Sequence, residues 1–233
     1  MDRPEDHSLE DQPLQDQSLF EQRLARARAV VEELKRLFPG ARIALTYGDP
    51  WQLLVAVVLS AQCTDKKVNQ VTGELFRKYP TLDDYLKADL AEFEQDIRPT
   101  GFYRNKAKNI LAAARIIKQE HGGAVPDTME ELVALPGVAR KTANIVLGNA
   151  FGKVEGIAVD THVRRLALKL DLTDHRDPDK IERDLMRLIP PEEWFATTYR
   201  LIDYGRNICP ARRHDCTSHP LTRIYPPAAE RWP

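Results

Sequence analysis

The sequence contains few cysteines and no long hydrophobic run. Its three cysteines are Cys63, Cys209 and Cys216, which are too few for a disulfide framework and therefore indicate a reducing compartment. No stretch approaches the roughly 20 apolar residues that a membrane-spanning helix needs. The acidic, Gln-rich start also lacks the basic and apolar regions of a signal peptide. These absences predict a cytoplasmic protein that has no membrane partner.

The remaining composition is that of a folded protein. With 233 residues, of which 42% are hydrophobic and 30% charged, the chain can bury one sizeable core or two small ones. Residues 1–20 carry a net charge of −5, so the net charge of −1 leaves +4 on the remainder. This mildly basic remainder permits a polyanionic partner without requiring one. We expect residues 1–18 to form a disordered acidic tail.

Apolar residues recur at helical spacing along most of the chain. They follow one face of a predicted helix over residues 20–38. Similar patterns predict helices over 51–61, 66–78, 90–97, 103–121, 161–170, 179–188 and 192–207. We find neither a convincing alternating strand pattern nor an internal repeat. The sequence therefore predicts an all-α fold.

The most informative segment is Leu-Pro-Gly-Val-Ala-Arg-Lys-Thr at residues 135–142. Before it, Thr128 and Glu131 have the spacing of a capping box and open a short helix. A Pro-Gly turn that runs straight into a second helix exposes backbone N–H groups, which can bind a phosphate. These elements predict a helix-hairpin-helix in which the N–H groups of Gly137 and Ala139 contact a nucleic-acid backbone.

Lys141 lies in the first turn of the second helix and is a candidate nucleophile. A free lysine has a pKa of about 10.4 and is charged at neutral pH, so a nucleophilic lysine needs a lowered pKa. The positive end of the helix dipole and the neighbouring Arg140 both disfavour the ammonium form. Nineteen positions later, Asp160 stands in the sequence Val-Asp-Thr-His as a candidate partner.

Together with the segment Leu-Ser-Ala-Gln-Cys-Thr-Asp at residues 59–65, these motifs resemble the endonuclease III family of helix-hairpin-helix DNA glycosylases with lyase activity. The resemblance extends from about residue 25 to about residue 220. It implies two helical lobes with double-stranded damaged DNA bound between them. One expected lobe is residues 46–153, which contain the hairpin. The other is residues 19–45 plus 154–233, which contain a C-terminal loop with an incomplete set of the family's iron-sulfur cluster ligands.

The resemblance implies that Lys141 and Asp160 are the catalytic residues. A damaged base must leave the stack before its sugar can be attacked. Lys141 would then attack the anomeric carbon, expel the base and form an imine. Asp160 would stabilise the positive charge on the sugar and assist proton transfers. The expected activity is base excision repair of oxidised pyrimidines, with strand cleavage by β-elimination.

Two further residues are expected to support base flipping. By resemblance, Gln62 fills the gap left in the duplex, and Phe102 presses into the opposite strand, where the family usually has an aliphatic residue. The family also has a second glycine where Ala139 stands. The complete set of expected DNA-binding residues is Gln62, Phe102, Pro136, Gly137, Val138, Ala139, Arg140, Thr142, Arg212 and Arg213. Asp65 is expected to be an N-cap or a residue near DNA, and His162 a packing residue.

The C-terminal loop departs from the family pattern. The family has four cysteines, separated by six, two and five residues, that hold an iron-sulfur cluster. Here Cys209 and Cys216 keep the first spacing, but His219 and Tyr225 occupy the other two positions. A four-iron cluster needs about four thiolates, so we expect no cluster. A zinc site from Cys209, Cys216 and either His214 or His219 stays open, although two free thiols and no metal are favoured.

Two other functions stay open. Taken singly, Lys141 fits a solvated surface lysine and Asp160 fits a helix N-cap. A noncatalytic helix-hairpin-helix protein would also contain the Pro-Gly turn. A glycosylase for another lesion, such as an adenine mismatch or an alkylated base, is the second alternative, and Lys141 argues against it. In each case we expect a monomer bound to DNA.

Overall fold

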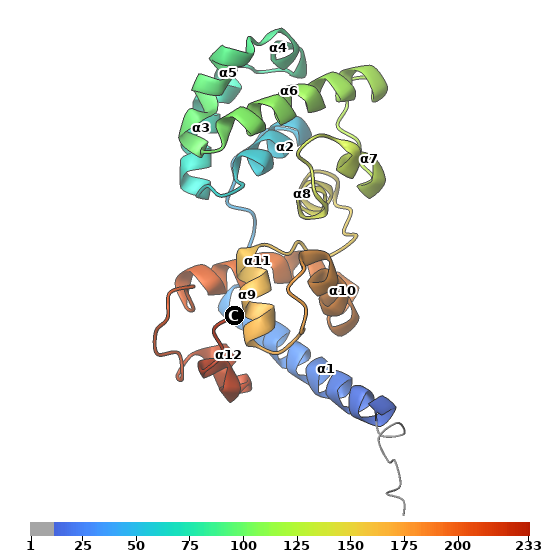
Figure 1. The fold of residues 1–233 in the computed structure, drawn as a ribbon, viewed down its shortest axis with the longest axis vertical. Coiled ribbons are helices and arrows are strands. Elements are labelled where there is room, and N and C mark those ends of the chain that lie inside the picture. Colours follow the sequence, from blue (N-terminus) through green and yellow to red (C-terminus); the bar gives the residue numbers. More distant parts are fainter. Residues whose placement is uncertain (1–11) are drawn as a thin grey trace, which may run out of the picture. The chain divides into compact units, whose positions relative to one another are not determined.

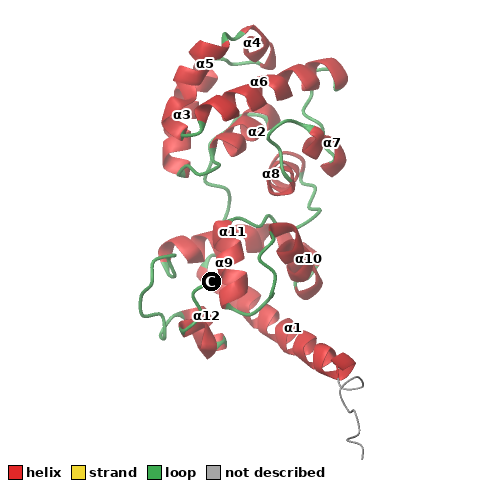
Figure 2. Cartoon of the chain, viewed as in Figure 1, coloured by secondary structure: helices red, strands yellow, loops and turns green. Residues whose placement is uncertain are grey.

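The computed structural model describes residues 12–233 (Figure 1), and the first part of the expected acidic tail, residues 1–11, lies outside the described residues. Every regular element within residues 12–233 is helical, and no strand occurs among them (Figure 2). The predicted all-α fold is therefore confirmed. Among the described helices we find none whose length and apolar character would let it span a bilayer.

The first helix, α1, spans Gln12–Leu37 and begins earlier than the sequence predicted. Residues 12–18 were assigned to the disordered tail, and this assignment is wrong because they belong to α1. The acidic residues concentrate before this segment, whereas glutamine and leucine within it have good helix propensity. Pro13 lies in the first turn of α1, where a missing N–H costs no intrahelical hydrogen bond.

The described chain divides into two compact units. One is Arg42–Ala158, and the other combines the residues up to Ala41 with Val159–Pro233. The first unit contains α2 (Pro50–Leu59), α3 (Asp65–Lys78), α4 (Leu82–Lys87), α5 (Leu90–Ile97), a 3-10 turn at Arg98–Thr100, α6 (Tyr103–Glu120), α7 (Met129–Ala134), α8 (Arg140–Val146) and a π-helical turn at Leu147–Phe151.

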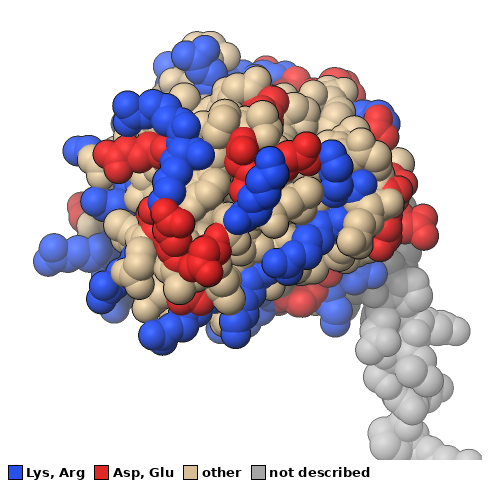
Figure 3. All heavy atoms as spheres, turned by 90° about the horizontal axis from the view of Figure 1, so that it is seen from above, with Lys and Arg blue, Asp and Glu red and all other residues tan. Residues whose placement is uncertain are grey.

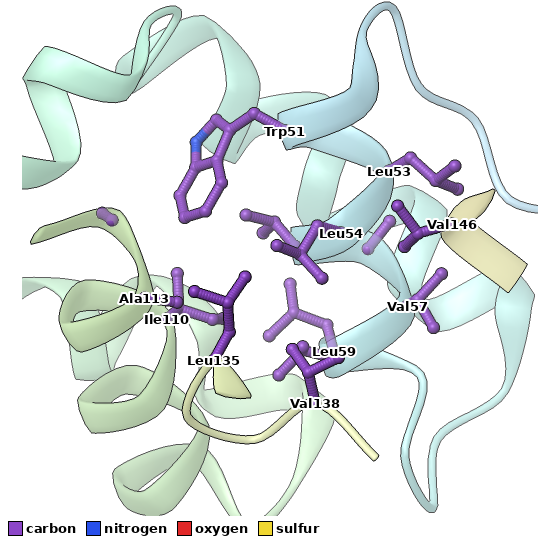
Figure 4. Packing of buried hydrophobic residues seen from close by; sticks show 14 of the residues in the cluster. Trp51, Leu53, Leu54, Val57, Leu59, Ile110, Ala113, Leu135, Val138 and Val146 are labelled. Atoms are coloured by element: carbon purple, nitrogen blue, oxygen red, sulfur yellow. The ribbon is translucent and has the colours of Figure 1, made fainter. Parts of the chain in front are cut away.

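The core of the first unit is built around α2. Asp49 caps this helix, since its Oδ1 accepts a hydrogen bond from the backbone N of Gln52 at 2.8 Å. Nearly every residue of α2 is apolar, and the helix packs against α3, α6 and α8. Leu135 and Val138 of the hairpin and Ile110 of α6 extend the same apolar cluster (Figure 4). The hairpin is therefore anchored to the most buried helix of the unit.

The second unit contains α1, α9 (Thr161–Lys169), α10 (Pro178–Leu188), α11 (Trp194–Asn207) and α12 (Pro220–Ile224), with short 3-10 turns at Pro191–Glu193 and Pro226–Ala229. Helix α11 packs against both α9 and α1, and α1 also contacts α10 and α12. Helices α9 and α10 begin at aspartate N-caps, Asp160 and Asp177, whose carboxylates accept backbone N–H bonds. These caps fix where each helix begins.

Candidate functional site

The hairpin joins α7 to α8 as the sequence predicted. Thr128 caps α7, because its Oγ1 accepts a hydrogen bond from the backbone N of Glu131 at 3.3 Å and donates one to Oε2 of Glu131 at 2.6 Å. Leu135 and Val138 are buried, and the backbone N of Val138 donates to the carbonyl of Leu135 at 3.1 Å. Gly137 lies between them and is exposed. The inner side of the turn thus belongs to the core, while its tip faces solvent.

Gly137 meets two constraints that only glycine satisfies. Its φ of +79° lies in the left-handed region, which L side chains rarely adopt. A Cβ atom at this position would lie 2.8 Å from Nδ2 and 2.9 Å from Cβ of Asn109 on α6. The turn therefore passes α6 closely enough to exclude any side chain.

Lys141 is the second residue of α8. Ala139 is the N-cap residue and has no polar side-chain atom, so it supplies no acceptor to the first N–H groups of this helix. Arg140 and Lys141 are both half-buried, and Thr142 is buried. The structure thus places Lys141 in the first turn, directly after the Gly137 tip. Val138 and Thr142 expose only 6% and 8% of their surface, which leaves their side chains little room to contact DNA.

Asp160 is the N-cap of α9 in the other unit. Its Oδ1 accepts hydrogen bonds from the backbone N atoms of His162 and Val163, each at 2.8 Å. The N-cap role considered from sequence is therefore present. Both bonds use the same oxygen, which fixes the orientation of the carboxylate.

Gln62 and Phe102 are exposed residues with left-handed backbones. Gln62 follows the end of α2 with φ +53°, and Phe102 precedes α6 with φ +49°. Non-glycine residues seldom adopt such conformations, and they cluster at functional sites where the surrounding structure enforces them. Phe102 exposes 66% of its surface, so it is no core aromatic. The structure presents both predicted wedge residues at the surface of the unit Arg42–Ala158.

Lys106 connects the two segments that carry these residues. Its Nζ donates hydrogen bonds to the carbonyl oxygens of Leu59 and Thr100, both at 2.8 Å. The side chain is buried, and burial lowers the pKa of its amino group. Its spacing of four from Ile110 places it on the apolar face of α6, and this signal could have identified it.

The structure also shows the roles of Asp65 and His162. Thr64, and not Asp65, is the N-cap of α3, since its Oγ1 accepts from the backbone N of Lys67 at 3.3 Å. Asp65 is the first residue of that helix. His162 packs against α11 so closely that a Cβ atom at Gly205 would lie 2.5 Å from its Nδ1, in agreement with the expected packing role.

The C-terminal loop contains the residues expected to replace the cluster ligands. Cys209 and Cys216 are buried, and burial raises the pKa of the Cys209 thiol. Guanidinium Nη2 of Arg165 donates to the carbonyl of Cys209 at 2.6 Å. Arg212 and Arg213 are exposed between Cys209 and the next helix, where they can meet a phosphate.

Tyr225, which stands at the fourth cysteine position of the family pattern, belongs to a network of charged residues. The ring of Tyr225 lies 3.9 Å from the guanidinium carbon of Arg26, and its hydroxyl lies 3.5 Å from Oδ2 of Asp171. Asp171 also pairs with Arg23, Arg26 and Arg231 at 3.2, 2.9 and 2.9 Å. With only two thiols available in this loop, its residues do not fit a four-iron cluster.

The surface charge is mixed where it can be viewed directly. On the face shown in Figure 3, lysine and arginine alternate with aspartate and glutamate. Such a face has no concentration of positive charge and does not attract a polyanion strongly.

Comparison with known proteins gives independent evidence. The family of HhH-GPD superfamily base excision DNA repair proteins matches residues 55–191. The chain is 51% identical to endonuclease III of Synechocystis sp. over 203 residues, which cover 87% of this chain and 93% of that protein. The structure of a non-covalent endonuclease III–DNA complex matches with a TM-score of 0.85 and 45% identity, covering 89% of this chain and 97% of that one. A trapped endonuclease III–DNA covalent intermediate matches with the same TM-score and identity, covering 89% and 98%.

The helical fold and the capped Pro-Gly hairpin thus define a base excision DNA repair protein of the helix-hairpin-helix class. The extent of identity is sufficient to go one step further. Within that class, the chain belongs to the endonuclease III family, and the resemblance drawn from its sequence is confirmed.

Proposed function

We propose that this member of the endonuclease III family is a bifunctional DNA glycosylase and AP lyase, which removes oxidised pyrimidines from double-stranded DNA. The observation that carries the proposal is the position of Lys141, one residue into α8 and directly after the glycine turn. A related chain of 45% identity forms a covalent intermediate with DNA, and a lysine at this place supplies the amine for such an intermediate.

The chemistry begins at the sugar of a flipped nucleotide. The lone pair of Lys141 Nζ attacks C1′ and forms a new bond. The bond from C1′ to the base breaks at the same time, and the base leaves with the electrons of this broken bond and gains a proton. Nζ then loses a proton as the sugar ring opens, giving an imine. Loss of a proton from C2′ expels the 3′ phosphate and cuts the strand. Water hydrolyses the imine and restores Lys141.

Asp160 has two roles in this proposal. One carboxylate oxygen caps α9 and holds the group in place. The negative charge of the carboxylate stabilises the cationic sugar that develops as the base departs, and the group relays protons. Arg140 and the positive end of α8 favour the uncharged form of Lys141, which is the nucleophilic form.

The other assigned residues hold the DNA. The backbone N–H groups of Gly137 and Ala139 bind a phosphate, and Pro136 and Val138 shape the turn that presents them. Gln62 fills the space of the flipped nucleotide and Phe102 enters the opposite strand. The side chains of Arg140, Arg212 and Arg213 contact the DNA phosphates through their positive charge, and Thr142 contributes its backbone.

The proposal also covers the oligomeric state, location, lobes, cofactor and partner of the protein. The protein acts as a monomer in the cytoplasm, with residues 46–153 and residues 19–45 plus 154–233 as its two DNA-binding lobes. It works without an iron-sulfur cluster, because Cys209 and Cys216 are the only cysteines in the C-terminal loop. Its partner is damaged double-stranded DNA.

Single-turnover kinetics on duplexes with thymine glycol or an abasic site test the proposal. Lys141→Gln should lose both base excision and strand cleavage, and Asp160→Asn should lose most of the excision rate, while both still bind the duplex. Lys153→Gln is the matched control, because Lys153 pairs with Asp127 at 2.7 Å and has no assigned role in catalysis. A protein that binds both duplexes without turnover would instead be the noncatalytic DNA-binding alternative.

A further inference from the structure

We propose that the C-terminal loop binds a single zinc ion through Cys209, His214 and His219. The thiol of Cys209 and one ring nitrogen from each histidine all lie within 4.8 Å of one another. Tetrahedral zinc with bonds of about 2.0–2.3 Å holds its ligand atoms about 3.5 Å apart. Closure onto an ion therefore requires movements of about 1 Å, which side-chain rotations can supply.

Two histidine nitrogens in this group are buried without hydrogen-bond partners among the described residues. They are Nε2 of His214 and Nδ1 of His219. Buried polar atoms are nearly always paired, and an unpaired one in a native structure often marks a missing ion or water. The two rings lie 5.1 Å apart between centroids and are tilted by 34°. Both unsatisfied atoms are thus found in one small cluster with a buried thiol.

The tautomer of His214 is suited to metal binding. Its Nδ1 lies 2.6 Å from the carbonyl oxygen of Arg212. A carbonyl only accepts hydrogen bonds, so Nδ1 carries the proton and the lone pair is on Nε2. Ligand histidines usually donate their second nitrogen to a carbonyl or carboxylate in this way, which fixes the ring and strengthens the ligand.

The C-terminal residues cover one side of the proposed zinc ligands. The ring of Trp232 meets that of His214 edge-on at 5.2 Å. Lys169 donates a hydrogen bond to the carbonyl of Arg231 at 2.8 Å, and its Nζ lies 3.7 Å from the Trp232 ring centroid. Cys209 exposes only 1% of its surface. The C-terminal residues therefore cover only part of the ligand group, since His214 and His219 are half-exposed.

The donor set favours zinc over magnesium and calcium. One thiolate and two imidazoles suit zinc, whereas magnesium and calcium prefer oxygen ligands. Nη1 of Arg165 lies 3.8 Å from Sγ of Cys209. Sγ of Cys216 is placed 3.8 Å from the carbonyl oxygen of Ala229, outside the ligand group. The fourth position on the metal is therefore left to a solvent molecule.

The zinc site stands in the loop where the family has its iron-sulfur cluster. Four residues separate Cys209 from His214, and four separate His214 from His219. His219 stands at the third cysteine position of the family pattern. His214, which lies outside that pattern, supplies the additional nitrogen. A single divalent ion thus takes over the task of fixing a loop that contains no regular element between α11 and α12.

Metal analysis of the full-length, tag-free protein tests this inference. Protein from zinc-supplemented cells should contain about one zinc per chain. Replacement by cobalt should give a near-ultraviolet thiolate-to-cobalt charge-transfer band and intense visible bands of a tetrahedral ion. Cobalt should also quench the fluorescence of the adjacent Trp232. Wild-type protein with neither bound zinc nor a cobalt spectrum would overturn the proposal, and this readout needs no variant to fold.

Variants then test the ligand set. Cys209→Ser, His214→Asn and His219→Asn should each lose zinc and the cobalt spectrum, with helical circular dichroism retained. Cys63→Ser and His175→Asn are the matched controls, since Cys63 lies in the other unit and His175 is exposed outside the loop. Cys216→Ser should keep the metal. Equal zinc loss in these controls, or in Cys216→Ser, would contradict the three-ligand assignment.

Discussion

A Cβ atom at Gly137 would lie 2.8 Å from Nδ2 of Asn109, so the hairpin turn passes α6 too closely for a side chain. Gly137→Ala must therefore shift either the turn or Asn109, and it also has to place alanine at a φ of +79°. We expect a loss of about 1–2 kcal/mol in the free energy of unfolding and weaker binding of duplex DNA.

Gly152 offers the matched control for this substitution. Its φ is +66°, but no atom lies within 4 Å of the position where a Cβ would stand. Gly152→Ala should thus have the same cost of placing alanine at a positive φ, but its Cβ should meet no neighbouring atom. Urea unfolding and fluorescence anisotropy on a duplex distinguish the two variants, and equal DNA affinities would show that the tight approach at Gly137 has no function.

Lys106 is predicted to stabilise the two wedge segments together. Lys106→Met keeps the apolar stem but leaves the carbonyl oxygens of Leu59 and Thr100 without their donor. We expect about 1–3 kcal/mol less stability and slower base excision from duplex DNA. Lys108→Met, an exposed position on the same helix, should change neither. Identical unfolding curves for both variants would refute the bridging role.

Gln62 is predicted to act in flipping and not in the covalent steps. Gln62→Ala should slow excision of thymine glycol about tenfold or more, because less of the few kcal/mol of unstacking is offset. Cleavage of a preformed abasic site should change less. Gln70→Ala on the exposed part of α3 is the control. The assignment fails if both reactions slow by the same factor.

The Asp171 network predicts a pH-dependent stability. Burial raises the pKa of Asp171, but hydrogen bonds from Arg231, Arg26 and Arg23 outweigh it and hold the pKa below its ordinary value of 3.8. The folded state thus binds this proton less tightly than the unfolded state. The stabilisation is present above pH 3.8 and is lost as the pH falls through the lowered folded-state pKa.

Substitution of this aspartate measures that contribution. Asp171→Asn should lower the free energy of unfolding by about 1–3 kcal/mol at neutral pH, and the difference from wild type should vanish at acid pH. Asparagine also tolerates the φ of +54° at this position. Asp174→Asn serves as the control, because Asp174 pairs with Arg23 of the same network at 2.7 Å but its side chain is 71% exposed. A difference that persists unchanged in acid would exclude an ionic origin.

Local signals in the sequence were sufficient for the hairpin. The Thr128 and Glu131 pair, the Pro-Gly turn and the apolar Leu135 and Val138 act over a few residues, and the structure places each where its chemistry requires. Helix periodicity likewise predicted the all-α fold. The start of α1 was misjudged because residues 12–18 were grouped with the polar, acidic residues before them.

Contacts between distant residues could not be predicted in the same way. Lys106 and Leu59 are 47 positions apart, and no local pattern indicates that one would donate to the other. The approach of Asn109 to Gly137 depends equally on how α6 packs beside the hairpin. The grouping of Cys209 with His214 and His219 requires the fold of a loop that has no periodic pattern.

Borohydride trapping tests the central role of Lys141 most directly. Reduction during turnover on an abasic-site duplex should convert the imine into a stable bond and give one covalent protein–DNA species. Peptide mapping should locate the attachment at Lys141. The Lys141→Gln variant should give no adduct, while the Lys153→Gln control gives as much as wild type. An undiminished adduct in Lys141→Gln would contradict the account.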